Sequence, residues 1–167
     1  MTENNSIANK VDLDTEILKK LCLDGRVSFR QLAKDLGNKS PVTIKKHIED
    51  LEQKEIIKSY GVQIDYEKLG YDIIALIEIT VSKGKMLEVE RKIAQNPNVF
   101  AVYDITGTYD ALILARFKTR AELSEMIKDE INTSPFVERT NTHIVLNIIK
   151  DESSFTKLIK KEESKTK

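Results

Sequence analysis

Lysine side chains gather in one short window of this sequence. Lys39, Lys45 and Lys46 fall between Asp35 and Glu49, and no acidic residue occurs inside that interval. Over the whole chain of 167 residues, Lys+Arg and Asp+Glu number 27 each, so no overall field draws the protein toward a polyanion. Binding of nucleic acid would therefore depend on this local charge. Taken alone, the same lysines also fit an ordinary solvated helix face.

Residue types that could bind a metal or form a catalytic nucleophile are scarce. One cysteine, Cys22, and two distant histidines, His47 and His143, do not make a zinc set or a catalytic triad. The glycines form neither G-x-x-x-x-G-K-[ST] nor G-x-G-x-x-G, so no nucleotide phosphate site is expected. The sequence predicts no metal, no cofactor and no enzyme activity. We expect Cys22, on an apolar helical stripe, to be a buried and inert thiol.

Two predicted helices precede the lysine window. Apolar residues recur with a helical period from Asp12, and Gly25 ends that run. Ser28 followed three residues later by Gln31 has the form of a capping box, which begins a second helix. Gly37 ends it.

The third helix carries two of the lysines. Ser40 is a good N-cap and Pro41 is tolerated at the first helical position, so this helix runs from Pro41 to about Lys54. Only residues 37–39 separate it from the second helix, which is typical of a helix-turn-helix. Its predicted inward stripe is Ile44, Ile48 and Leu51.

A helix-turn-helix of this kind points to double-stranded DNA, because the major groove admits one helix whose N-terminal residues reach base edges. Phosphate contacts then position that helix without reading sequence. The candidates for base contact are Ser40, Val42 and Thr43. The candidates for phosphate contact are Arg26, Arg30, Lys39, Lys45, Lys46 and His47.

The second half of the chain alternates between strand and helix patterns. An extended strand is expected over 56–65, and Tyr66 to Gly70 connects it to the second half. Ser82 and the Thr119–Glu122 capping box each predict a helix start. Further strands are expected over 73–81, 99–106, 110–117 and 137–149. This βαββαβ order is the ferredoxin-like arrangement, with one sheet face left to oligomerise or bind a ligand.

The predicted fold class is α+β, with five segments along the chain. A flexible arm (1–11) precedes a winged-helix-like helix-turn-helix domain (12–58), a connecting strand and linker (59–70), the βαββαβ domain (71–150) and a charged tail (151–167). The tail either forms a helical turn through Phe155, Leu158 and Ile159 or is disordered.

Composition and the chain start indicate a cytoplasmic protein. Hydrophobic residues make up 40% and charged residues 32%, close to the globular average. The longest apolar-rich run, Ile73 to Val81, is interrupted by Glu78 and is far shorter than the ~20 residues of a membrane span. The first residues lack the apolar core of a secretory leader.

Two sets of residues then occur in one collinear order over roughly residues 11 to 150. The first set is Asp24–Ser28, Leu32, Ala33, Gly37, Ser40, Pro41, Ile44, Ile48, Leu51, Glu52 and Ile56–Tyr60; the second is Val102–Asp110 and Val137–Thr142. With these residues the chain resembles the Lrp/AsnC family of feast/famine transcription regulators. The first half resembles the family's DNA-binding domain and the second half its effector-sensing domain.

The chain departs from the family pattern at several positions near the expected DNA contacts. His47 stands where the family usually has arginine, and Glu49 and Asp50 stand where basic residues are frequent. Glu55 and Ser59 replace glycines that are common before the connecting strand. These departures concern phosphate contacts and leave the core pattern intact.

The resemblance implies a sequence-specific, nucleoid-associated regulator that binds a pseudo-palindromic site as a homodimer, assembling further to tetramers or octamers. It also implies a small amino-acid effector between C-terminal domains, with carboxylates for its ammonium and backbone amides or hydroxyls for its carboxylate. The positions that match are Asp104, Gly107, Thr108, Tyr109, Asp110, Thr140 and Thr142. An ordinary glycine hairpin is the alternative for 107–110.

Other functions also stay open. Sirohaem decarboxylases share the two-part architecture, and a tetrapyrrole site would have to use His47, His143, Arg116 and Arg139. A DNA-binding protein that answers to no effector, or a sensor with a vestigial helix-turn-helix, are further alternatives. The identity of the effector, the direction of regulation and the target sequence do not follow from the residues.

Overall fold

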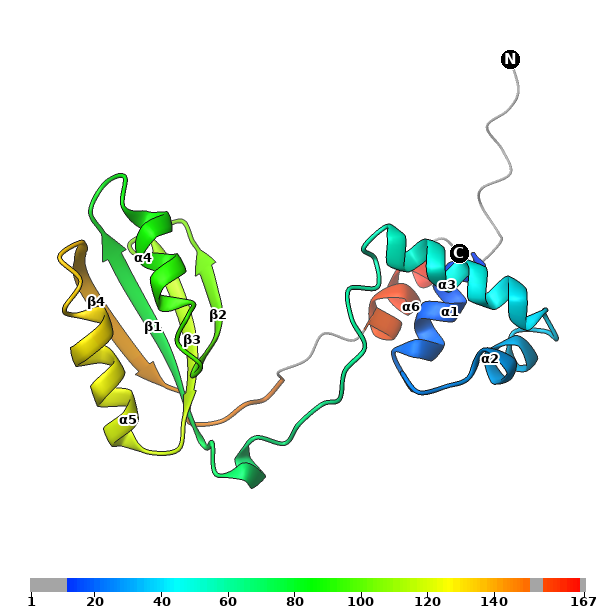
Figure 1. Cartoon of the computed structure of the whole chain (residues 1–167), viewed down its shortest axis with the longest axis horizontal. Coiled ribbons are helices and arrows are strands. Elements are labelled where there is room, and N and C mark those ends of the chain that lie inside the picture. The colour runs from blue at the N-terminus through cyan, green and yellow to red at the C-terminus, as the bar shows by residue number, and fades with distance from the viewer. Residues whose placement is uncertain (1–11, 151–154, 166–167) are drawn as a thin grey trace, which may run out of the picture. The chain divides into compact units, whose positions relative to one another are not determined.

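The computed structural model describes residues 12–150 and 155–165, which form two compact units (Figure 1). A helical unit extends to Gln63 and includes the C-terminal helix, and a second unit begins at Ile64. The predicted arm (1–11) and the start of the predicted tail (151–154) lie outside the described residues. Among the helices described, none has both the length and the apolar character to cross a bilayer.

Three helices build the first unit as predicted: α1 (Leu13–Leu21), α2 (Phe29–Asp35) and α3 (Pro41–Gln53). Ser28 Oγ accepts the Gln31 N–H at 3.2 Å, which caps α2. The second half of the expected capping box is absent, because the Gln31 side chain donates to Asp35 Oδ1 at 2.7 Å instead of reaching back. Ser40 caps α3 by accepting the Val42 N–H at 3.2 Å.

The turn between α2 and α3 has the backbone that the sequence predicts. Gly37 and Asn38 have φ angles of 86° and 55°, a left-handed conformation that glycine and asparagine tolerate best. The Lys39 N–H donates to Ala33 O at 2.9 Å and closes the turn. The helices bury a small core made of Ile17, Leu32, Ala33, Ile44, Ile48 and Leu51.

Cys22 and the segment after α3 differ from expectation. Cys22 is the C-cap of α1 and is exposed, because the helix ends before its side chain can join the apolar stripe. The strand predicted over 56–65 is absent, since no described strand lies beside these residues to accept their hydrogen bonds. A short 3₁₀ turn, Glu67–Leu69, follows.

The second unit is a four-stranded antiparallel sheet with helices on one face (Figure 1). Its strands are β1 (Ile73–Val81), β2 (Val99–Asp104), β3 (Ala111–Phe117) and β4 (Val137–Ile144), in the spatial order β2-β3-β1-β4. The helices are α4 (Met86–Ile93) and α5 (Arg120–Glu125), which continues as a π-helical segment, Met126–Ile131. The predicted ferredoxin-like order is confirmed.

Several elements in this unit are shorter than predicted. β4 ends at Ile144 because only one further backbone bond, Val145 N–H to Ile74 O at 2.9 Å, extends its pairing. Ser82 does not cap α4, which starts four residues later. Instead, the Ser82 backbone N–H donates to Phe136 O at 2.8 Å. The cap of α5 is confirmed, since Thr119 Oγ1 accepts the Glu122 N–H at 3.2 Å.

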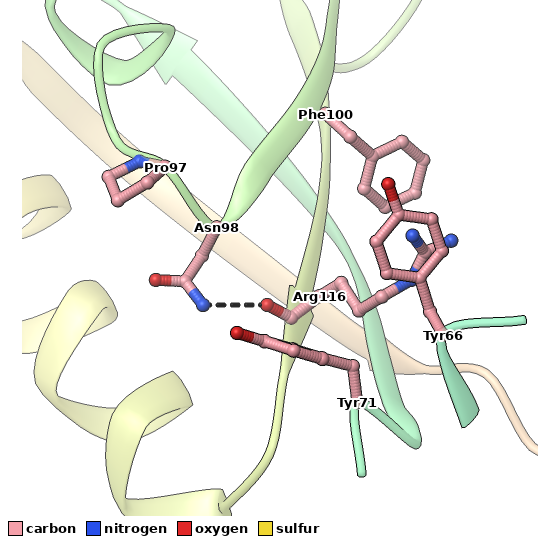
Figure 2. Close-up of a pocket in the computed structure, with 6 residues that line it drawn as sticks. All are labelled: Tyr66, Tyr71, Pro97, Asn98, Phe100 and Arg116. Carbon is pink, nitrogen blue, oxygen red and sulfur yellow. Dashed lines mark hydrogen bonds between the residues drawn. The ribbon is translucent and has the colours of Figure 1, made fainter. Parts of the chain in front are cut away.

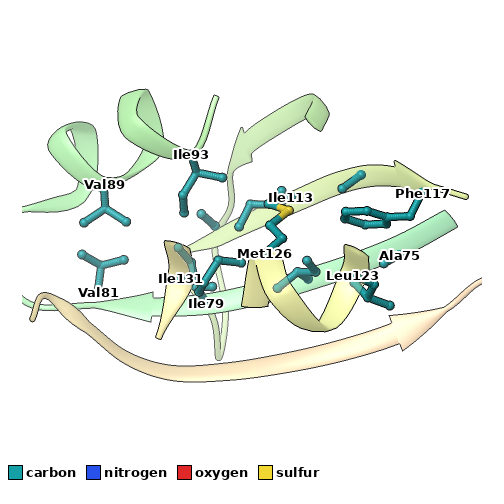
Figure 3. Close-up of a cluster of buried hydrophobic side chains, with 13 residues drawn as sticks. Ala75, Ile79, Val81, Val89, Ile93, Ile113, Phe117, Leu123, Met126 and Ile131 are labelled. Carbon is teal, nitrogen blue, oxygen red and sulfur yellow. The ribbon is translucent and has the colours of Figure 1, made fainter. Parts of the chain in front are cut away.

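Alternation along β1 and β3 separates a buried face from an open one. Ala75, Ile79 and Ile113 point toward the helices (Figure 3) and, with Ile77, join the core of the unit. The intervening residues on the opposite face are only partly buried; they include Ile74, Leu76, Leu112 and Leu114. The sheet therefore has one covered face and one apolar face that the described chain leaves open.

The tail forms the helix that was one of its two predicted states. α6 spans Phe155–Lys165 and belongs to the helical unit. Phe155 and Ile159 are partly buried, whereas Leu158 is exposed.

Candidate functional site

The N-terminal half of α3 presents a polar and cationic face to solvent. Val42 is 75% exposed, an unusual position for a valine in a helix whose other apolar residues are buried. Thr43, Lys45 and Lys46 are exposed beside it, while Ile44 packs inward. The cap at Ser40 orients this first turn. The predicted separation between core stripe and outward face is confirmed.

The charge on this face is only partly neutralised. Lys45 Nζ lies 3.4 Å from Glu49 Oε1, one turn along the helix, and both side chains are more than half exposed. Lys39 and Lys46 are exposed and form no ion pair within residues 12–150 and 155–165. An exposed pair such as Lys45–Glu49 contributes little to stability and is readily exchanged for a phosphate.

His47 has a partner inside the protein. Its Nδ1 lies 2.6 Å from Asp14 Oδ1 of α1, and the ring is about one-third exposed. This contact joins α3 to α1 across the helical unit. The ring therefore positions α3, and only its remaining nitrogen is free to meet a phosphate.

The two arginines predicted for phosphate contact lie at the loop before α2 and in its first turn. Arg26 and Arg30 are both exposed. The Arg26 backbone N–H donates to Asp24 Oδ1 at 2.9 Å, which shapes the loop and leaves the guanidinium outside. Both side chains belong to the same unit as α3.

One feature of the helical unit was missed by sequence reasoning. Tyr60 O–H donates to Glu52 Oε1 at 2.8 Å and ties the segment after α3 back onto that helix. Partial burial of the hydroxyl and this hydrogen bond to a carboxylate raise the pKa of Tyr60 to about 12. The phenol therefore stays protonated and the tie persists at neutral pH.

In the second unit, the predicted effector loop is anchored to β1. Asp110 Oδ2 accepts the Val81 N–H at 2.8 Å, and the Asp110 N–H donates to Ile79 O at 2.9 Å. Ile105 N–H closes the loop on Asp110 O at 2.9 Å. Asp110 thus has a structural role at the end of β1, where the strand register shifts between Thr80 and Val81. This role does not depend on a ligand. The φ of 129° at Gly107 explains the glycine there.

The two sets of predicted effector residues lie on different sides of β1. Ala111, next to Asp110, pairs with Ile79 from β3, while Thr140 pairs with Ile79 from β4. Two inter-strand spacings, about 10 Å, separate these positions. Thr142 lies two residues further along, on the same helix-facing side. The two sets therefore come from the strands on either side of β1.

A buried carboxyl beside Asp104 was also missed. Glu90 of α4 is only 9% exposed, and its Oε1 has no hydrogen-bond partner in the described structure. Burial, with the negative charge of Asp104, raises the pKa of Glu90. The signal in the sequence was its spacing, since Glu90 follows Met86 by four residues and so shares the inward face. Leu87, on the other side of α4, is 63% exposed.

The remaining loop residues and the cations of the tetrapyrrole hypothesis are dispersed. Tyr109 stacks under Arg139, whose Cζ lies 5.4 Å from the ring centroid, and Thr108 is exposed. His143 contacts Glu78 at 3.2 Å on the open sheet face, and His47 belongs to the other unit. The described residues contain no cluster of three or more side chains that could hold a metal ion.

Sequence comparisons agree with both halves of this structure. Residues 74–155 match the model of the Lrp/AsnC ligand binding domain. An HTH-type transcriptional regulator of Pyrococcus horikoshii is 41% identical over 140 residues, which cover 84% of this chain and 93% of that protein. The HTH-type transcriptional regulator FL11 of Pyrococcus furiosus is 36% identical, with coverage of 84% and 91%. The regulatory protein AsnC of Haemophilus influenzae is 35% identical, with coverage of 79% and 88%.

Solved structures of transcriptional regulators have a similar fold. Escherichia coli AsnC superposes with a TM-score of 0.82 at 28% identity, covering 88% of this chain and 99% of that one. A transcriptional regulator of Neisseria meningitidis, solved as a complex with L-Met, has a TM-score of 0.78 at 23% identity and coverage of 87% and 96%. The second similarity supports the fold.

Proposed function

The chain belongs to the Lrp/AsnC family of HTH-type transcriptional regulators, and on that premise we propose that it binds DNA through the exposed face of α3. The observation that carries this proposal is the outward first turn of α3, where Val42 and Thr43 stand exposed beside Lys45 and Lys46. Methyl groups on Val42 and Thr43 suit thymine methyls in the major groove. The lysines, with Lys39, suit the flanking phosphates.

The remaining candidate residues would contribute to this interface in different ways. Arg26 and Arg30 would reach phosphates from the loop and first turn of α2. Ser40 caps α3 and can still donate its own hydroxyl hydrogen to a phosphate. His47 would act mainly by holding α3 on α1 through Asp14.

A salt titration of DNA binding tests the assignment. Replacing Lys45 and Lys46 with alanine should weaken specific and non-specific binding together and reduce the slope of log K against log salt by about 2, because each lysine releases condensed counterions. A matched control is Lys92→Ala with Lys128→Ala, which removes two exposed lysines from the second unit. Equal slopes for the Lys45/Lys46 variant and the parent would contradict the assignment of this face.

The DNA site should be pseudo-palindromic, because the protein is proposed to act as a homodimer. Support comes from the open sheet face and from exposed apolar side chains in the segment after β4: Leu146 is 89% exposed and Ile149 is 95% exposed. A monomer seldom leaves such a surface bare. Dimers would assemble further to tetramers or octamers, and half-sites would lie about 34 Å apart or a multiple of it. Such a regulator would act in the cytoplasm, at the nucleoid.

A small amino acid is proposed as the effector, held between second units of neighbouring subunits. The origin of the two sets on opposite sides of β1 supports a shared site, in which one subunit offers Asp104 with the 107–110 loop and another offers Thr140 and Thr142. The bound L-Met of the Neisseria meningitidis regulator supports the ligand class. Binding could alter DNA affinity only through unequal affinity for two assemblies.

A thermal-shift screen of the twenty amino acids tests the effector, since a ligand of the folded state raises the melting temperature. The variants should be Asp104→Asn and Thr140→Val, because Asp110→Ala would also remove the bond to Val81 N–H. Thr15→Val, in the helical unit, is the control. A shift that survives in both test variants would place the ligand elsewhere, and no shift with any amino acid would favour a regulator without such an effector.

A further inference from the structure

A pocket of about 280 Å³ lies at the far end of the sheet from the 107–110 loop. It is formed where the segment before β1 meets the start of β2 and the end of β3 (Figure 2). Its lining is mainly aromatic, with one cation and one amide: Tyr66, Tyr71, Pro97, Asn98, Phe100 and Arg116. A concave site of this size with few polar groups is typical of small-molecule binding.

Arg116 is held by aromatic rings and not by an acid. Its Cζ lies 4.0 Å from the Tyr66 ring centroid and 4.7 Å from that of Phe100, and Figure 2 shows the guanidinium beside both rings. Its Nε is buried and lacks a hydrogen-bond partner in the described structure. Ring faces satisfy the charge but leave the in-plane N–H donors without acceptors. A guanidinium can donate two parallel hydrogen bonds to the two oxygens of one carboxylate.

The frame of the pocket is fixed by hydrogen bonds. Asn98 Nδ2 donates to Arg116 O at 2.7 Å, and the Arg116 N–H donates to Asn98 O at 2.8 Å. Tyr66 and Tyr71 meet edge to face with centroids 6.3 Å apart. Lys118 Nζ lies 4.7 Å from the Tyr71 ring centroid.

Acidic side chains lie nearby but line a different cavity. Asp65, Glu67 and Asp72 belong to an adjoining pocket of about 220 Å³, and Asp65 is paired with Lys68 at 2.8 Å. Among the described residues, no charged side chain besides Arg116 lines the aromatic pocket itself. The two pockets share Tyr66, Tyr71 and Arg116, so a ligand in the aromatic pocket meets the charge of Arg116 with these acids on the neighbouring side.

We propose that this pocket binds a small aromatic monocarboxylate, with its carboxylate on Arg116 and its ring against Tyr66, Tyr71 and Phe100. Arg116 lies six residues along β3 from Asp110, about 20 Å at the rise of a strand. The site is therefore separate from the proposed effector loop. Arg116 shares the open sheet face with Leu112 and Leu114, so the proposal requires that a second copy leaves this end of the face uncovered.

Calorimetric titration of the full chain with benzoate tests the proposal, with benzamide as the uncharged analogue. Benzoate should saturate at one molecule per chain. Benzamide should bind at least about tenfold more weakly, because it carries no negative charge to form an ion pair with the guanidinium. Arg116→Gln should weaken benzoate by a similar factor, and Arg116→Lys should fall between. Arg91→Gln, which removes an exposed arginine of α4, should bind like the parent.

Tyrosine ring signals in NMR spectra locate the bound molecule. Benzoate should shift the signals of Tyr66 and Tyr71, assigned through their phenylalanine variants, and leave Tyr109 unmoved. Phe100→Leu provides a second test of the pocket if Arg116→Gln does not fold. Equal binding of benzoate and benzamide, shifts confined to Tyr109, or failure of benzoate to saturate would each overturn the proposal. The last result includes the case in which a second copy fills the pocket.

Discussion

At the scale of single residues, the polar side chains that matter most are those whose partners come from distant parts of the sequence. Asp110 holds the end of β1 through Val81, and His47 links α3 to α1 through Asp14. Each is a candidate binding residue that also supports the fold. A variant at either position will therefore change stability as well as binding, and binding data need a folding control.

Glu90 leads to a prediction about pH and stability. Because its pKa is raised in the folded state, the folded protein holds that proton more tightly than the unfolded chain. The free energy of unfolding should then fall as pH rises from the ordinary value of 4.5 through the raised pKa. Glu90→Gln should be more stable than the parent at pH 7 by about 1 kcal/mol, and this gain should vanish below pH ~4.

Denaturant unfolding at several pH values would measure this effect. Glu125→Gln, a change at an exposed carboxyl of α5, should leave the curve of stability against pH where the parent has it. A Glu90→Gln variant with the same pH dependence as the parent would show that the buried carboxyl does not carry the linkage.

At the scale of elements, the helix-turn-helix depends on two serine caps and a left-handed turn. Ser28 and Ser40 each accept one of the orphaned N–H groups at the start of a helix. Between the two caps, the left-handed residues Gly37 and Asn38 turn the chain from α2 to α3. The direction in which α3 leaves this turn decides whether its first residues face solvent.

Removing the cap of α2 should loosen the helical unit without changing any side chain of α3. Ser28→Ala should lower local stability by about 1 kcal/mol, seen as a roughly fivefold rise in hydrogen exchange of the protected amides of Ile44 and Ile48. Ser59→Ala, outside any helix, is the control. Unchanged exchange in Ser28→Ala would mean that the cap contributes no net stability.

At the scale of the whole molecule, the chain forms two units with separate hydrophobic cores. The helical unit buries six hydrophobic residues, whereas the second unit buries thirteen beneath one face of its sheet. We expect the larger core to support independent folding, and the other face of its sheet is the surface proposed for dimerisation.

A chain of residues 64–150 should accordingly fold and self-associate without the helical unit. Sedimentation should show a dimer or larger species at micromolar concentration, and Leu112→Lys with Leu114→Lys on the open face should shift it toward monomer. Glu122→Lys with Glu125→Lys, on the helical side, should not. A monomeric fragment together with a dimeric full chain would place the interface in the helical unit.

Local patterns determined most of the architecture. Helix starts at Ser28, Ser40 and Thr119 were predictable because a cap acts on the next two or three residues, and alternation in 73–81 and 110–117 was readable because side chains point to opposite faces with period two. Ile44, Ile48 and Leu51 were assigned to the core for the same short-range reason. The order of these elements, together with the family resemblance, was enough to predict both folds and the regulator class.

Contacts between distant residues were decided only by the tertiary structure. Glu90 is buried by a sheet, Arg116 is stacked on rings from two other segments, and Asp110 bonds a strand 29 residues earlier. The predicted strand over 56–65 needs a neighbouring strand that the described chain does not supply. Pairing partners, solvent exclusion and strand register are properties of the assembled fold, so they cannot be read from the identity and spacing of neighbouring residues.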